Sequence, residues 1–459
     1  MTITDTFTEL APFDALRATV NGTVAEPGDD AYVALVTPWN LAVAMQPAAV
    51  VAAADAEDIA TTVRFAAARG LQVGVQATGH GARSALAGQI LVSTKQLDEV
   101  TIHPEGWARV GAGVKWARVL EAAAPYGYAA LNGSTSDVSV VGYTTGGGVG
   151  PMARTYGLAA DRVRAFEVVT GDGELRRVTP TQHSELFFGL RGGKGALGIV
   201  TAIEFDLIPL PTFYGGALYF DGADAERVVS RWRTWSAGLP EQATTSFVLL
   251  QLPPLPFVPE PLAGKLTIGV RFVWTGDPSE GAALFQPMRE VGTPILDAIG
   301  EHPYAAIDLV HADPVDPLPA VERAMLLADF PGEAADALLG LVGAGSESPQ
   351  VIVEIRQLGG AYARPGQHES AFDHHDAAFS LLMIGMPNIP GTPEHSASVV
   401  AALAPWGYEG IWPNFVPAED AETARAAYRP ETLARLRAIA DTYDPDEVFT
   451  MGAAIRAAR

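Results

Sequence analysis

The sequence predicts an α+β protein in which an N-terminal domain is followed by a central domain of different texture and by a C-terminal segment that returns to the first domain. Helical and strand patterns separated by glycine turns alternate through the N-terminal part. After Pro209 and Pro211 the chain changes to longer helices and strands with fewer glycines, which indicates a boundary. We therefore expect domains over 1–210 and 211–405, and a returning segment over 406–459.

Residues 55–75 predict a helix followed by a strand. Asp55 suits the N-cap, Gly70 suits the position just past the helix C-terminus, and residues 71–75 alternate as a strand does. Three further elements follow from similar signals: a strand, glycine turn and helix over 107–124, a β-hairpin over 163–178, and a strand over 199–208.

The central part carries strand patterns at 266–274 and 350–358, and a proline-rich surface loop at 253–262. The tail predicts a helix that Asp444 and Pro445 close, followed by an extended run to Ile455. This helix and extended run are the basis for expecting a return to the first domain.

Composition excludes several classes of function. The 459 residues include no cysteine, which rules out disulfides, thiolate metal sites, iron–sulfur clusters and a cysteine nucleophile. A formal net charge of −23 disfavours nucleic acid and anionic membrane surfaces as partners. No apolar stretch approaches the roughly 20 residues of a membrane span, and the first residues lack the features of a signal peptide. We expect a cytoplasmic protein; nothing in the sequence indicates its oligomeric state.

Two glycine-rich segments suggest a cradle for one large phosphate-bearing cofactor. Residues 76–82 read QATGHGA after a predicted strand, and residues 133–150 contain six glycines. Glycine lets backbone N–H groups approach phosphate or a planar ring closely. With the GAGVKW segment at 111–116, the two loops predict a dinucleotide site with His80 beside it.

Other motifs carry less weight. Gly193, Gly195 and Gly198 form a formal GxGxxG, but a helical pattern precedes them and a strand pattern follows, the reverse of an NAD-binding turn. We interpret them as a tight turn before a strand. His374 and His375 are adjacent, so their side chains diverge, and no metal site is expected. Neither an esterase GxSxG nor a P-loop occurs.

Eight segments in a fixed order resemble the FAD-linked oxidases of the berberine bridge enzyme type, in the vanillyl alcohol oxidase and p-cresol methylhydroxylase superfamily. They are QATGHG, GAGVKW, GSTSDVSVVGYTTGGGVG, YGLAADRV, VVTGDGELRRV, LFFGLRGGKGALGIVT, EIRQLGGA and YDPDEVF. The resemblance implies an FAD-binding domain formed by the N-terminal part plus the tail. It also implies a central α+β substrate domain with an antiparallel sheet above the flavin.

Carried over by position, the resemblance makes residues 76–82 the pyrophosphate loop and His80 the residue bonded to the flavin 8α-methyl. Thr135 stands where many relatives have a cysteine that forms a second bond, so a single histidyl link is expected. Val138 stands where oxygen-reactive members carry valine, which favours an oxidase. The expected FAD-binding residues are Gln76, Ala77, Thr78, Gly79, His80, Gly81, Ala82, Gly133, Thr135, Val138, Ser139, Gly142, Tyr143, Gly146, Gly147, Gly150, Val200 and Asn414.

The catalytic base is not assigned by the resemblance, because the family's Tyr-x-Asn reads Trp412-Pro413-Asn414 here. Strand alternation puts Glu354 and Arg356 on one face. If that face looks into the site, Glu354 is a candidate base and Arg356 a candidate anion anchor; the alternative is a charged pair on the outer face. Weaker candidates are Tyr143, Tyr362 and His374. If none serves, an amine that loses hydride without a base becomes more plausible.

The expected function is an FAD-dependent oxidase that moves hydride from a small or medium-sized organic alcohol, amine or ring carbon to covalently bound FAD. Oxygen would then take the electrons and give hydrogen peroxide. One alternative is a flavin dehydrogenase or an oxidative cyclase of a biosynthetic pathway. A second is a relative that binds a ligand without catalysis.

Overall fold

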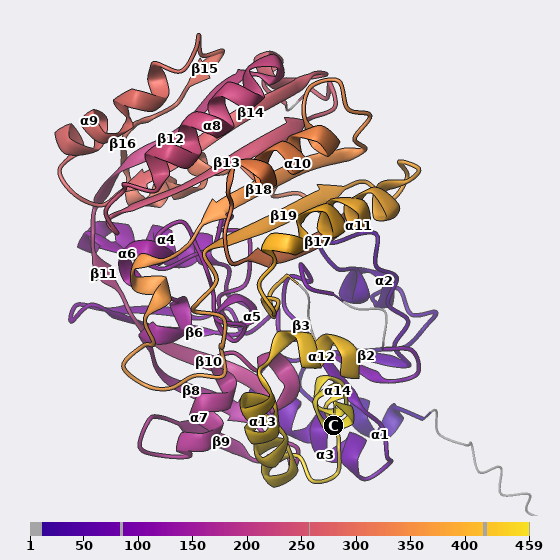
Figure 1. Ribbon diagram of the computed structural model, residues 1–459. Helices are drawn as coiled ribbons and strands as arrows, with labels where there is room; N and C mark the ends of the chain where they lie inside the picture. The colour runs from indigo at the N-terminus through magenta and orange to yellow at the C-terminus, as the bar shows by residue number, and fades with distance from the viewer. Residues whose placement is uncertain (1–11, 83–85, 257, 416–419, 459) are drawn as a thin grey trace, which may run out of the picture.

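The computed structural model describes residues 12–82, 86–256, 258–415 and 420–458, and its fold is α+β (Figure 1). The first sheet has the order β1-β2-β4-β3. Its strands are β1 (Thr23–Ala25), β2 (Ala49–Ala52), β3 (Val73–Gln76) and β4 (Ile90–Ser93), and β2, β4 and β3 run parallel. The predicted helix is α3 (Ala56–Ala67), whose N-cap Asp55 accepts a hydrogen bond from the Asp58 amide. The crossover from β2 to β3 runs through α3, and the helix and the strand predicted over 55–75 are both present.

An antiparallel second sheet has the order β5-β6-β10-β8-β9. Its strands are β5 (Val100–His103), β6 (Trp107–Gly111), β8 (Val163–Val169), β9 (Leu175–Val178) and β10 (Ile199–Asp206). The predicted hairpin is β8–β9, and the predicted strand and helix are β6 and α4 (Trp116–Ala123). The strand expected over 199–208 ends at Asp206. Ile208 belongs to a separate strand, β11 (Ile208–Pro209), which pairs with β7 (Tyr128–Ala129).

The glycine-rich stretch 133–150 contains a short helix that its composition hides. Ser139 caps α5 (Val140–Thr144) by accepting a hydrogen bond from the Gly142 amide at 3.4 Å. A second short helix, α6 (Ala153–Tyr156), follows the glycines. The stretch is therefore a loop, a helical turn and a second loop.

A large antiparallel sheet dominates the central part of the chain, in the order β15-β12-β14-β13-β18-β19-β17, with β16 pairing with β12. The strands are β12 (Thr212–Asp221), β13 (Ala243–Gln251), β14 (Leu266–Trp274), β15 (Leu296–Asp297), β16 (Gly300–Pro303), β17 (Val321–Leu327), β18 (Gln350–Gln357) and β19 (Phe379–Gly385). Both strands predicted here are present, as β14 and β18.

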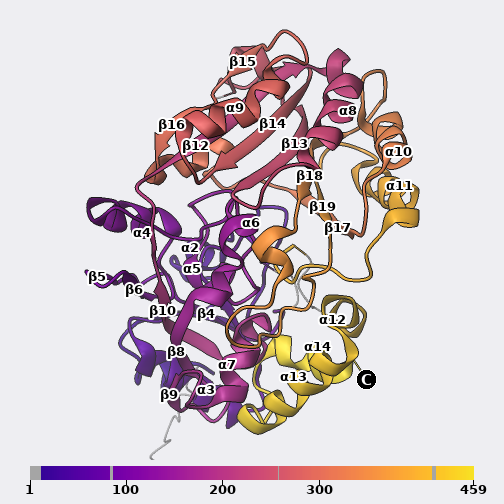
Figure 2. The same cartoon turned by 60° about the vertical axis from the view of Figure 1, so that its left-hand side comes forward.

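The two faces of this sheet have different neighbours. Helices α8 (Ala225–Ser236), α9 (Pro278–Arg289), α10 (Gly332–Val342) and α11 (Thr392–Leu403) cover its outer face (Figures 1 and 2). Buried side chains such as Phe247, Val270 and Ile355 fill that layer. The opposite face turns toward the N-terminal part of the chain.

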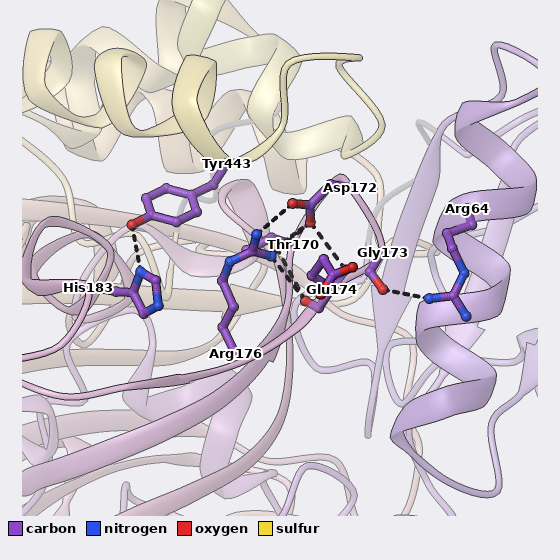
Figure 3. Close-up of polar contacts among 8 residues, drawn as sticks. All are labelled: Arg64, Thr170, Asp172, Gly173, Glu174, Arg176, His183 and Tyr443. Atoms are coloured by element: carbon purple, nitrogen blue, oxygen red, sulfur yellow. Dashed lines mark hydrogen bonds and ion pairs between the residues drawn. The ribbon is translucent and has the colours of Figure 1, made fainter.

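The C-terminal helices α12 (Ala421–Ala427), α13 (Pro430–Tyr443) and α14 (Thr450–Ala457) pack against the N-terminal sheets (Figure 2). The Tyr443 carbonyl accepts a hydrogen bond from the Gly171 amide, and the Tyr443 hydroxyl lies 3.1 Å from His183 Nδ1 (Figure 3). Figure 3 also shows the ion pair between Arg176 and Asp172 in the β8–β9 hairpin. The tail thus returns to the first part of the chain, while the three domain ranges given above stay a prediction.

The extended run expected to Ile455 is wrong beyond Phe449. Phe449 forms a parallel bridge with Val73, the first residue of β3, and α14 begins at the next residue. Residues 450–457 are rich in alanine, the strongest helix former, and the buried Ala454 and Ile455 face the core. The alternation seen in the sequence covers only the residues before Thr450.

Among the described residues, no helix is long and apolar enough to cross a membrane. In the same part of the chain, no group of three histidine, aspartate or glutamate side chains gathers in a way that suits a metal ion.

Replacing Asp444 with alanine should lower the free energy of unfolding by about 1 to 3 kcal/mol, because buried amides lose their acceptor. The fully buried Asp444 carboxylate accepts hydrogen bonds from the Val448 and Phe449 amides at 2.8 and 3.2 Å. Urea denaturation measures the effect. The matched control is Asp446→Ala at an exposed position, which should change stability by less than about 0.5 kcal/mol; equal losses in both variants would contradict the role given to Asp444.

Candidate active site

A cavity of about 390 Å³ lies between the N-terminal part and the inner face of the large sheet. The loop after β3 and the glycine-rich stretch around α5 form one side. Residues of β17, β18 and β19 form the other, and Phe449, Thr450 and Met451 of the tail complete the lining. The N-terminal part, the large sheet and the tail therefore all contribute to one cavity, whose volume is within the usual range for small-molecule sites.

The loop over 76–82 depends on glycine for its shape. Gly79 has a φ of +82°, and a Cβ there would lie 2.7 Å from Pro38 Cα. Only glycine accepts both the left-handed backbone and the close approach. The turn places His80 at the cavity.

The His80 side chain is held in place yet keeps one free nitrogen. Its ring stacks on Trp39 at 4.4 Å between centroids, and Nδ1 lies 3.0 Å from Thr78 Oγ1. Nε2 is buried and has no partner among the described residues. Burial lowers the pKa of the His80 imidazole to about 4. At neutral pH the ring is therefore uncharged and has a lone pair available for bonding.

Several other buried polar atoms around the cavity lack a partner within the part of the chain that the structure describes. They are both side-chain amide atoms of Gln76, the Tyr143 hydroxyl and Asn414 Oδ1. A buried polar group without a hydrogen bond costs about 1 to 3 kcal/mol. Such a set suits a ligand with many donors and acceptors, and the ring and ribityl chain of a flavin have them. The residues present therefore fit FAD.

Most of the residues predicted to bind the cofactor border this cavity. They are Gln76, Ala77, Thr78, Gly79, His80, Gly81, Ala82, Gly133, Thr135, Val138, Ser139, Gly142, Tyr143, Gly146, Val200 and Asn414. Gly147 and Gly150 do not. A Cβ on Gly147 would lie 2.4 Å from the Phe372 ring, and one on Gly150 would lie 2.0 Å from the Asn132 carbonyl oxygen. These two glycines thus allow close packing within the protein.

Sequence reasoning missed several cavity residues. Gly195 and Gly198 of the discounted GxGxxG border the cavity, as do Lys194, Asp313 and Glu322. The run GGKGALG was the sequence signal available for Lys194, Gly195 and Gly198. Asp313 and Glu322 stand in no motif. Among the described residues, they are the carboxylates that border the cavity.

The charged pair of β18 faces inward. Glu354 and Arg356 are 3% and 5% exposed, and Ser246 of β13 pairs with Arg356 in the sheet register. The Glu354 carboxylate accepts hydrogen bonds from Arg271 Nη1 at 2.8 Å, Ser246 Oγ at 2.6 Å and Arg356 Nη2 at 2.9 Å. The alternative, in which this charged pair lies on the outer face of the sheet, is therefore wrong.

The surroundings of Glu354 argue against a role as catalytic base. Burial alone would raise the pKa of Glu354, but Arg356 and Arg271 outweigh it and hold that pKa well below its usual range. A carboxylate held ionised in this way has little affinity for a proton. Glu354 also does not border the cavity, whereas Arg356 does.

The weaker base candidates fare no better. Tyr143 borders the cavity, but burial raises the pKa of its hydroxyl far above neutral pH. The Tyr362 hydroxyl donates to the His374 carbonyl and accepts from Trp412 Nε1, and His374 Nε2 lies 2.8 Å from the Ala427 carbonyl oxygen. Neither Tyr362 nor His374 borders the cavity. Both act as packing and hydrogen-bonding residues beside it.

Comparison with known proteins supports the same cofactor. A family model described as an FAD binding domain matches residues 47–179. The (R)-6-hydroxynicotine oxidase of Paenarthrobacter nicotinovorans is 26% identical, with 95% of this chain and 96% of the relative covered. The chain is therefore similar over nearly its full length to an FAD-linked oxidase, in agreement with its resemblance to the berberine bridge enzyme type.

Two crystal structures show how far the fold of this family is shared. That of 6-hydroxy-D-nicotine oxidase from Arthrobacter nicotinovorans has a TM-score of 0.80 at 24% identity, covering 94% of this chain and 97% of that one. Glucooligosaccharide oxidase from Acremonium strictum has a TM-score of 0.82 at 20% identity, covering 97% and 99%. The FAD of the latter has a 6-S-cysteinyl and an 8α-N1-histidyl link. A chain without cysteine excludes the first of these links.

Replacing Glu354 with glutamine should destabilise the protein by about 3 to 5 kcal/mol, because two buried guanidinium groups lose the charge that compensates them. Urea denaturation measures the loss. The matched control is Glu167→Gln, which breaks a half-exposed pair with Arg109 at 2.8 Å and should cost less than about 1 kcal/mol. A Glu354→Gln protein as stable as the wild type would contradict this structural role.

Proposed function

We propose that this protein is an FAD-dependent oxidase with one covalent link, between His80 and the flavin 8α-methyl. It would oxidise a small or medium-sized organic alcohol, amine or ring carbon and pass the electrons to oxygen, giving hydrogen peroxide. The observation that carries this proposal is His80: a neutral imidazole with an unpartnered nitrogen, fixed by Trp39 and Thr78 beside a glycine cradle. FAD supplies the two-electron acceptor for such chemistry.

The glycine-rich loops would hold the two ends of the cofactor. The backbone of residues 76–82 suits the pyrophosphate, since it lacks side chains at Gly79 and Gly81 where it borders the cavity. Gln76, Tyr143 and Asn414 have the unpartnered donors and acceptors for the polar edges of the cofactor. Thr135 stands in the cavity wall and its Oγ1 accepts a hydrogen bond from the Asp137 amide, so a second covalent link has no candidate there.

The substrate side of the cavity is largely apolar. Ile352, Leu382 and Ile384 come from the large sheet, and Trp412 and Phe415 come from the segment before α12. These side chains suit a carbon skeleton and exclude water from the reacting C–H bond. Asp313 and Glu322 are the carboxylates that this geometry offers as proton acceptors.

Val138 supports oxygen as the electron acceptor. Its side chain borders the cavity, and its carbonyl accepts a hydrogen bond from the Trp116 amide, which fixes its position. The resemblance to the family makes a valine here a sign of access for oxygen. The named relative from Paenarthrobacter is itself an oxidase.

Removing the His80 ring should abolish the covalent link. Acid-denatured wild-type protein should show flavin fluorescence on the polypeptide band in a denaturing gel, and His80→Ala should show none. His103→Ala is the control, because His103 lies on β5 outside the cavity. A His80→Ala band as bright as the wild type would overturn the assignment.

Enlarging Val138 to leucine should slow the reaction of reduced flavin with oxygen by about tenfold or more, equivalent to at least about 1.4 kcal/mol of barrier. Stopped-flow mixing of photoreduced enzyme with oxygenated buffer measures the rate. Ferricyanide serves as the control acceptor, since electron transfer to it does not require entry to the cavity. Equal oxygen rates would remove the access argument. Product formed without peroxide would favour the dehydrogenase or cyclase alternative, and a purified protein without flavin would favour the ligand-binding one.

A further inference from the structure

Arg356 borders the cavity and has hydrogen-bond donors that no described residue uses. Its Nη2 lies 2.9 Å from Glu354 Oε2 and 3.3 Å from His311 Nε2. Its Nε and Nη1 have no partner among the described residues, although the side chain is only 6% exposed. A guanidinium has five N–H donors in a rigid planar fork, so Nε and Nη1 keep donors that suit an anionic oxygen.

The cluster around Arg356 has an excess of positive charge. Two buried guanidinium groups, those of Arg271 and Arg356, share the single carboxylate of Glu354. Burial lowers the pKa of His311. The neutral imidazole supplies no negative charge to compensate the two guanidinium groups. Asp313 acts on Arg271 only through its electrostatic field, with no hydrogen bond or ion pair between them. An uncompensated buried cation is costly, and an anion in the cavity would relieve that cost.

The strand geometry separates this positive site from the apolar part of the cavity. Ile352 lies four residues before Arg356 on the same face of β18, about 13 Å away at the usual rise per residue. Leu382 stands opposite Glu354, and Ile384 opposite Ile352. A ligand with an anionic end at Arg356 would thus lay its carbon skeleton along these aliphatic side chains.

We propose that Arg356 binds an anionic oxygen, and that the substrate carries a carboxylate. Glu354 and Arg271 act as positioning residues that hold the guanidinium against the cavity wall. That the bound anion is a substrate rests on the proposed oxidase function. The anion site itself requires only the folded holoenzyme. The same donors would also suit negative charge that develops on the flavin when it is reduced, and the experiment separates these two sources.

The test is a titration of the oxidised holoenzyme with benzoate and with its neutral isostere benzamide, followed by the change in flavin absorption. Acetate and acetamide form a second pair in case the ring is too large. In both pairs we expect the acid to bind at least about tenfold more tightly than the amide, a preference of the size expected from a charge-assisted hydrogen bond. Arg356→Gln should abolish the preference, and Arg356→Lys should retain part of it.

The matched control is Arg323→Gln. Arg323 lies on β17 of the same sheet, but its Nε donates to Ser396 Oγ on the helix-covered side. That variant should keep the wild-type preference for the acid. Flavin content and thermal unfolding identify any variant that does not fold, and Arg356→Lys decides the question if Arg356→Gln is such a variant.

Three results would overturn the proposal. One is that neither acid binds more tightly than its amide. Another is that Arg356→Gln keeps the preference. The third is that Arg356→Gln lowers the flavin reduction potential with no effect on acid binding, which would assign the guanidinium to the reduced flavin. Loss of peroxide formation or of the His80 link would overturn the oxidase proposal instead and leave the acid titration intact.

Discussion

The ion-paired carboxylate of Glu354 is the interaction on which the inner face of the large sheet depends. That face cannot be apolar throughout, because it borders a cavity lined by polar loops, and it cannot be solvated, because the N-terminal part covers it. Glu354 resolves the conflict by joining β13, β14 and β18 through Ser246, Arg271 and Arg356. A buried ion pair contributes little net stability, but losing one member is costly, so the Glu354 carboxylate holds both guanidinium groups in place. The cavity therefore has a rigid wall above a glycine-rich side.

A second set of contacts links the cofactor side to the substrate side. Trp39 stacks on His80 and donates through Nε1 to the Val315 carbonyl, while the Asn40 side chain exchanges two hydrogen bonds with Ala320. The loop that carries Asp313 is therefore attached to the ring that stacks on His80.

The sequence could predict the parts of the site that local pattern determines. The glycine turns indicated two loops that border the cavity in the structure, and His80 between two glycines borders it as well. Alternation put Glu354 and Arg356 on one face, but a period of two does not say which face is buried, so only the assembled sheet decided between a base and an ion pair. Trp39 and Asp313 reach the cavity through contacts across almost the whole chain, and no motif marks them. The extended run predicted to Ile455 was wrong because the alternation in the sequence ends at Phe449, and an alanine-rich helix begins at the next residue.

The bridge between Val73 and Phe449 has a consequence for the order of assembly. β3 leads directly into the loop that carries His80, and its first residue is paired with the tail, whose next residues, Thr450 and Met451, line the same cavity. A chain still on the ribosome would lack this support, so the cradle is incomplete until translation has passed these positions. The proposed attachment of a cofactor at His80 would thus be a late event, which follows synthesis and docking of the tail.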